Sequence, residues 1–169
     1  MHWSWIDRYI EFHGGSRAAA VKNFSLAESY FRNYYPRHPI MPSTLILEGM
    51  GQTGMYLACE AIGYRQLIIL AKVATARFYF AVRPGDALTY SVSINSIQDQ
   101  GVSVSAVSRV GERLQGEADL LYARIADRSP DGRSDLFELV RQMRLLGVYA
   151  VGRSSEGGPL QPPAIPAAP

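Results

Sequence analysis

The sequence predicts an α+β protein in which an antiparallel β-sheet is wrapped around one long central helix. Three observations lead to this fold class. Residues 43–63 carry apolar side chains on all sides of a helix, so that helix has to be buried. Residues 67–126 read as consecutive strands separated by tight turns, the pattern of an antiparallel meander. Only a sheet that curls can cover most sides of a single helix.

Composition favours a soluble, cytoplasmic, single-domain protein. With 169 residues, 47% of them apolar and 19% charged, the chain can bury one real core. The net charge of +2 is too small to predict nucleic-acid binding. A lone cysteine, Cys59, cannot form an internal disulfide, which favours a reducing compartment. The longest apolar stretch, residues 44–62, contains Glu48, Gln52 and Glu60, so no membrane span is expected. The histidines have no metal-ligand spacing, and no metal is expected.

The first elements are short. Residues 5–10 fit either a helix or a strand, and residues 17–24 fit a strand. Ser25 is a candidate N-cap for a short helix over residues 26–31. Three prolines between positions 36 and 42 then predict a rigid extended loop, because proline fixes φ and removes a donor.

The central helix is predicted over residues 43–63, with Pro42 just before it and Gly63 at its end. Each glycine inside a helix costs about 1 kcal/mol relative to alanine. We therefore expect another backbone to approach this helix closely at its three interior glycines, Gly49, Gly51 and Gly54.

Four β-rich segments follow. Residues 67–82 form a long run that we expect to bend or break near Ala74. Residues 88–95 and 102–110 alternate apolar and polar side chains, as half-buried strands do, and residues 117–126 close the set. The expected sheet has four or five antiparallel strands.

The C-terminal region is predicted to lie outside the main domain, which spans residues 1–127. Residues 128–151 comprise a linker and an amphipathic helix over 134–146 that packs against the domain. Residues 152–169 are rich in Gly, Ser, Pro and Ala, and they are predicted to be disordered.

Chemistry is expected at the start of the central helix. Glu48 lies in the second turn of a helix that is otherwise apolar, and a buried carboxylate is costly unless it has a partner or a function. Gln52 follows four residues later on the same face and can orient Glu48 through a hydrogen bond. The first amides of the helix, at Ser43 and Thr44, have no intrahelical acceptor and suit an oxyanion or a thioester carbonyl. The alternatives are that Glu48 only reaches a polar partner, such as an arginine, across an interface, that Gln52 is a surface residue, and that the helix start is an ordinary capped end.

Residues 34–52, YYPRHPIMPSTLILEGMGQ, resemble the signature of the (3R)-3-hydroxyacyl-[acyl carrier protein] dehydratases, which are FabZ/FabA-like and have the hotdog fold. That signature runs His-Phe-Pro-Gly-x-Pro-(Ile/Val)-Met-Pro-Gly, then an apolar stretch with Glu and Gln. The resemblance extends over about residues 5–127. The positions in register are Pro36, Pro39, Ile40, Met41, Pro42, Leu45, Glu48 and Gln52.

The resemblance implies dehydration to a trans-2-enoyl thioester in fatty-acid or related lipid biosynthesis. Glu48 matches the carboxyl residue that a partner subunit contributes, and the Ser43 N–H matches the oxyanion donor. Tyr34 stands where the family has its catalytic histidine. A phenol with an ordinary pKa near 10 is a poor base beside an imidazole near 6.5. His38, in the same loop, is an alternative base.

The resemblance also implies the partners. The substrate would be carried on the phosphopantetheine of acyl carrier protein, with no other cofactor, and the chain would form a homodimer or a trimer of dimers. Because of Tyr34, a second hypothesis is a non-catalytic acyl-binding subunit whose paralogue supplies the histidine. A third is another thioester reaction, such as hydrolysis or isomerisation, on the same scaffold.

Overall fold

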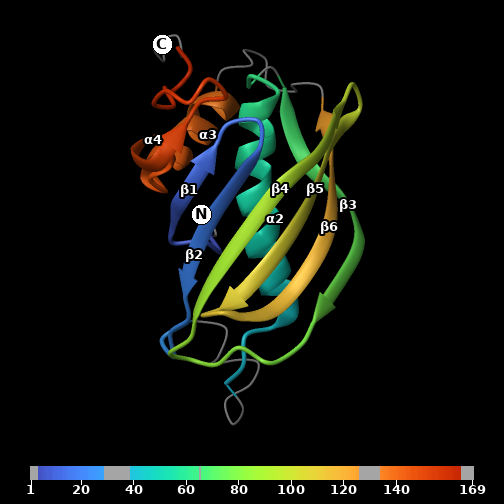
Figure 1. Ribbon diagram of the computed structural model, residues 1–169, viewed down its shortest axis with the longest axis vertical. Helices are drawn as coiled ribbons and strands as arrows, with labels where there is room; N and C mark the ends of the chain where they lie inside the picture. Colours follow the sequence, from blue (N-terminus) through green and yellow to red (C-terminus); the bar gives the residue numbers. More distant parts are fainter. Residues whose placement is uncertain (1–3, 29–38, 65, 126–133, 165–169) are drawn as a thin grey trace.

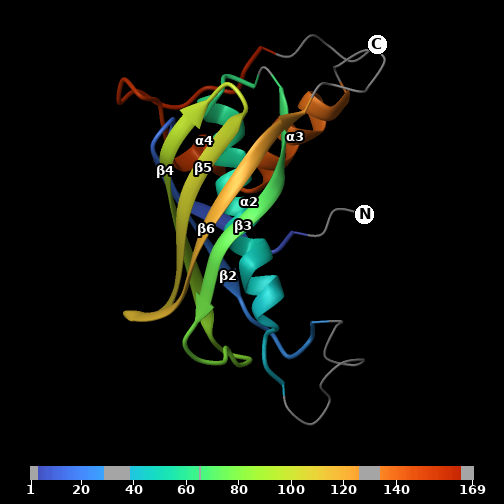
Figure 2. The same cartoon turned by 90° about the vertical axis from the view of Figure 1, so that its right-hand side faces the viewer.

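The computed structural model describes residues 4–28, 39–64, 66–125 and 134–164. In these residues a long helix, α2 (Ser43–Ala61), lies against the concave side of a curved sheet, and smaller helices pack at the sheet's end (Figures 1 and 2). This is the hotdog architecture that the sequence predicts. None of the helices in the described ranges is long and apolar enough to span a membrane.

The sheet has seven strands in the order β3-β6-β5-β4-β2-β1-β7. Neighbouring strands are antiparallel except β1 and β7, which run parallel. Their bounds are β1 Arg8–His13, β2 Arg17–Asn23, β3 Leu67–Phe78, β4 Ala87–Gln98, β5 Gly101–Val110, β6 Arg113–Ile125 and β7 Gly152–Arg153.

The alternation read from the sequence decides which face of the sheet meets α2. On β4, Leu88, Tyr90 and Val92 are buried in the core, while Ser91 and Ser93 between them lie on the opposite, outer face. The inward residues of β5 and β6 complete the same core around the helix. The helix is therefore covered by a single sheet.

The structure settles several local predictions. Of residues 5–10, residues 8–10 belong to strand β1 and residues 5–7 precede it. The segment 67–82 is a strand only as far as Phe78. Its pairing with β6 shifts register between Leu70 and Lys72 and again between Val73 and Thr75, so the strand continues through Ala74 with an irregularity at that residue. The short helix expected over 26–31 is wrong for residues 26 and 27, which form a turn. Residues 29–31 lie outside the described part of the chain.

The expected count of four or five strands is wrong, partly because the C-terminal segment joins the sheet. Helix α3 (Ser134–Leu145) buries Val140 and Met143, as its amphipathic pattern predicts. A four-residue helix, α4 (Val148–Val151), then leads into β7, which pairs with Phe12 and His13 of β1.

The prediction of disorder from Gly152 onward is wrong for residues 152–164. The Gly14 N–H donates to the Arg153 carbonyl over 2.8 Å, and Leu160 is only 6% exposed. Backbone pairing with β1 orders this segment, and such pairing requires no side-chain signature in the sequence. Residues 165–169 lie outside the described ranges.

The glycines of α2 make room for tyrosine rings, and the expectation of an approaching backbone is wrong. A Cβ at Gly49 would lie 2.6 Å from Cε2 of Tyr90, and one at Gly54 would lie 2.6 Å from Oη of Tyr122. At Gly51 the nearest atom, Cδ2 of Leu70, is 3.7 Å away, an ordinary contact. Two of the three glycines are thus required by aromatic side chains from β4 and β6.

At the far end of α2, Glu60 accepts a hydrogen bond of 2.8 Å from the Gly15 N–H in the β1–β2 turn. Burial raises the pKa of this carboxyl above its ordinary value of 4.5, and the Gly15 N–H only partly offsets that effect. The folded chain therefore holds more protons than the unfolded chain above about pH 4.5, so this group's contribution to stability falls as pH rises.

We expect Glu60→Gln to remove this dependence of stability on pH, because an amide keeps the acceptor oxygen without titrating. Relative to wild type, the variant's free energy of unfolding should increase between about pH 4 and about pH 7. Urea titrations at both pH values measure this difference. A constant difference would show that burial of the Glu60 carboxylate does not affect stability.

Candidate active site

The start of α2 opens into a pocket of about 580 Å³. One wall is the chain that enters the helix, residues 40–44, and the other is the end of β3 with the loop after it, residues 78–81. The two walls are joined by a hydrogen bond of 2.9 Å from the Met41 N–H to the Val82 carbonyl. The pocket is therefore mainly apolar, with a helix N-terminus at one side.

The amides at this helix start are available to a ligand. Pro42 is the N-cap and offers no side-chain capping bond, and its carbonyl accepts from the N–H groups of Leu45 and Ile46. Within the described ranges, neither Ser43 N–H nor Thr44 N–H has an acceptor. Because both residues line the pocket, a carbonyl oxygen placed there can accept a hydrogen bond from them.

Glu48 is held in place by a chain of hydrogen bonds. Gln52 Nε2 donates to Glu48 Oε1 over 2.9 Å, so the contact expected from their spacing is present. Gln52 Oε1 in turn accepts from the backbone N–H of Trp5 over 2.8 Å. That second bond fixes which end of the amide faces Glu48, and so the amide presents a donor to the carboxylate.

The expectation that Glu48 is buried is wrong for the single chain, in which the side chain is exposed. Glu48 is also absent from the lining of the pocket at the helix start. Within one subunit, therefore, the Ser43 and Thr44 amides are at the pocket, whereas the Glu48 carboxylate is exposed outside it.

Tyr122 lies close enough to this carboxylate to be affected by its charge, but it cannot act as a base. Burial raises the pKa of Tyr122 well above its ordinary value, and the negative charge of Glu48 raises it further. Its Oη donates to the Gly51 carbonyl over 2.6 Å, so the hydroxyl proton is already engaged in a hydrogen bond. Tyr122 therefore positions the helix.

Of the three histidines, only His13 lies in the described part of the chain. It is on β1, where its Nε2 is 3.0 Å from Glu11 Oε1, so it belongs to a surface cluster and not to this site. Tyr34 and His38, the two candidate bases, both lie outside the described residues.

The Cys59 thiol is not an activated nucleophile. Burial raises the pKa of the Cys59 thiol to about 12, so the thiol stays protonated. The described ranges contain no group of three or more His, Cys, Asp or Glu side chains that could hold a metal ion.

Two contributors to the site could not be read from local sequence patterns. Trp5 acts through its backbone N–H, which carries no side-chain signal. Phe80 lines the pocket and has Arg113 over its ring, with Cζ 4.2 Å from the ring centroid. Phe80 and Arg113 are more than thirty positions apart in the chain, and only the paired sheet brings them together.

The comparisons with known proteins agree with this geometry. A family model described as a FabA-like domain matches residues 2–113. A 3-hydroxyacyl-[acyl-carrier-protein] dehydratase FabZ from Polaromonas sp. is 35% identical over 120 residues, which cover 69% of this chain and 83% of that protein. The enzyme of the same name from Caldanaerobacter subterraneus subsp. tengcongensis is 36% identical over 118 residues, covering 69% and 84%.

Solved structures share the fold at low sequence identity. One is the dehydratase heterocomplex ApeI:P from Xenorhabdus doucetiae, with a TM-score of 0.53 and 14% identity, covering 66% of this chain and 90% of that one. Helices α3 and α4 and strand β7 all lie beyond the residues that match the family model.

Proposed function

The chain belongs to the FabA-like family, and on that premise we propose that it removes water from (3R)-3-hydroxyacyl-[acyl carrier protein] to give the trans-2-enoyl thioester. The setting would be fatty-acid or related lipid biosynthesis. In this reaction the Ser43 N–H holds the thioester oxygen and Glu48 protonates the departing hydroxyl. The base that takes the α-proton is Tyr34 or His38.

One observation carries this function: the chain of hydrogen bonds from Trp5 through Gln52 to Glu48, on the helix whose start supplies free amides to an apolar pocket. An ordinary surface glutamate does not need an amide held by a buried segment. A general acid does, because proton transfer depends on a fixed distance and direction.

We place the acid and the amides of each site on different subunits. In a single chain Glu48 is exposed and lies outside the pocket lining, which suits a carboxylate that serves a neighbour's pocket. Strand β3 is an edge of the sheet, and it exposes apolar side chains at Ile69, Leu70 and Val73. Pairing of two β3 edges would satisfy the open backbone groups and cover these side chains.

The direct test is to incubate the purified protein with (3R)-3-hydroxyacyl-[acyl carrier protein] and to detect loss of water by mass spectrometry. We expect dehydration, and we expect Tyr34→His to accelerate it, because neutral imidazole accepts a proton at pH 7 far better than a phenol does. Release of the free acid would instead identify a hydrolase. No water loss by either form would overturn the function.

Tyr34 itself favours a second candidate, a subunit that binds acyl thioesters and works with a paralogue. A mixed dimer would contain one complete site, formed by the paralogue's histidine and Glu48 of this chain. The other site would pair Tyr34 with the paralogue's carboxyl residue. The Xenorhabdus neighbour is itself a dehydratase heterocomplex.

The two candidates are separated by mixing this chain with the histidine-bearing paralogue. For a mixed dimer, Glu48→Gln in this chain should abolish the added activity, whereas Tyr34→Phe should leave it unchanged. An active homodimer whose rate is unaffected by the paralogue would exclude the mixed assembly.

A further inference from the structure

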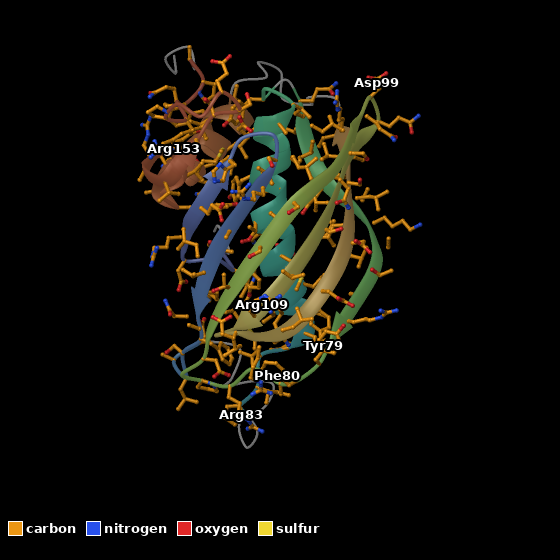
Figure 3. The ribbon with its side chains drawn as sticks, viewed as in Figure 1. Tyr79, Phe80, Arg83, Asp99, Arg109 and Arg153 are labelled. Carbon is orange, nitrogen blue, oxygen red and sulfur yellow. The ribbon has the colours of Figure 1, made fainter. Side chains whose placement is uncertain are left out.

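Two arginines lie beside the pocket at the start of α2 without a described acidic partner. Arg113, the first residue of β6, lies over the ring of Phe80, which lines the pocket. Arg83 follows two residues after Ala81, another lining residue. Figure 3 shows Phe80 and Arg83 at the end of the molecule where α2 begins. Both arginine side chains are exposed, and neither forms an ion pair within the described ranges.

Three carboxylates are near these arginines in the chain, Asp86, Glu112 and Glu117, and none of them forms an ion pair with either arginine within the described ranges. Asp86 Oδ2 accepts from the backbone N–H of Arg83 over 2.8 Å. Glu117 accepts from the Tyr79 hydroxyl over 2.7 Å and lies 3.5 Å from Arg77. Neither guanidinium group is therefore paired with a carboxylate in the described part of the chain, and both can bind an anionic ligand.

The position of Arg113 is built by the fold and does not depend on the arginine alone. Two hydrogen bonds fix the backbone at Phe80. Gln115 Nε2 donates to the Phe80 carbonyl over 2.8 Å, and Gln115 Oε1 accepts from Ser108 Oγ over 2.7 Å. Gln115 and Ser108 are both fully buried. A fixed ring under a guanidinium limits the directions in which its N–H groups can point.

We propose that Arg113 binds the phosphate of the phosphopantetheine arm that carries the acyl thioester, with Arg83, from the loop after β3, as a second cation at the same end of the molecule. This inference rests on the proposed function, which places the thioester carbonyl at the Ser43 amide in the same pocket. A guanidinium offers paired N–H donors that match phosphate oxygens and keeps its charge at every relevant pH. The site then distinguishes phosphorylated carriers from neutral thioesters.

The test compares two ligands that differ only in the phosphate, butyryl-phosphopantetheine and butyryl-pantetheine. Neither carries a 3-hydroxyl group, so calorimetry measures binding without turnover. We expect wild type to bind the phosphorylated thioester about tenfold more tightly at low salt, with a smaller preference at high salt. Arg113→Gln should remove most of that preference and leave binding of butyryl-pantetheine unchanged.

Arg109→Gln is the matched control. Arg109 is also exposed at this end of the molecule (Figure 3), but it pairs with Thr89 on the outer face of the sheet and donates to the Glu112 carbonyl. The control should keep the tenfold preference. The phosphate site would be overturned if both variants lost the preference for the phosphorylated thioester equally, or if wild type had no such preference. Either result would leave the proposed function intact. If neither thioester binds, both the phosphate site and the proposed function fail.

Discussion

Replacing Glu48 with glutamine should lower the rate of dehydration by about a hundredfold to ten-thousandfold, the usual contribution of a general acid. The amide keeps the size of the side chain and an oxygen that can accept from Gln52, so the local structure should persist. Its N–H protons are far too weakly acidic to be transferred to the departing hydroxyl. The loss should therefore appear in kcat, with little change in KM.

Glu60→Gln is the control for this experiment, because it makes the same chemical change near the other end of the same helix. Glu60 contacts the β1–β2 turn and lies outside the pocket lining. We expect it to retain the full rate. Undiminished dehydration by Glu48→Gln would exclude Glu48 as the acid.

Replacing Gly49 with alanine should destabilise the protein by about 2 kcal/mol. The new Cβ would fall among the ring atoms of Tyr90, which is completely buried and cannot move aside. Such overpacking costs about 1–3 kcal/mol, sometimes more, and the gain of about 1 kcal/mol in helix propensity offsets only part of it. Urea unfolding followed by circular dichroism measures the change.

Gly51→Ala makes the identical substitution one half-turn later and isolates the effect of the tyrosine ring. Its Cβ would meet only Cδ2 of Leu70 at 3.7 Å, so the gain in helix propensity should dominate. We expect the free energy of unfolding to rise by up to about 1 kcal/mol. Equal destabilisation at both positions would mean that backbone flexibility, and not the Tyr90 ring, requires glycine in α2.

The main elements could be predicted because their signals are local. The α2 helix begins at Ser43 as its proline boundary predicts, and β4 and β5 follow their alternating side chains. The register of the motif also singles out Glu48, Gln52 and Ser43 as candidate site residues. The hydrogen bond between Glu48 and Gln52 is a consequence of helical spacing, and the structure contains it.

Local patterns were enough to predict the kind of protein. They comprise a helix that is apolar on all sides, a meander to cover it, and a motif that places a carboxyl residue and free amides at the helix start. The surroundings of these features depend on how the elements pack. The tertiary structure put tyrosine rings over Gly49 and Gly54, left Glu48 exposed, placed Arg113 over Phe80 and paired residues 152–153 with β1. The physical reason is that periodicity reports which face of an element is apolar, whereas contacts between elements depend on strand order and backbone pairing, which have no local signature.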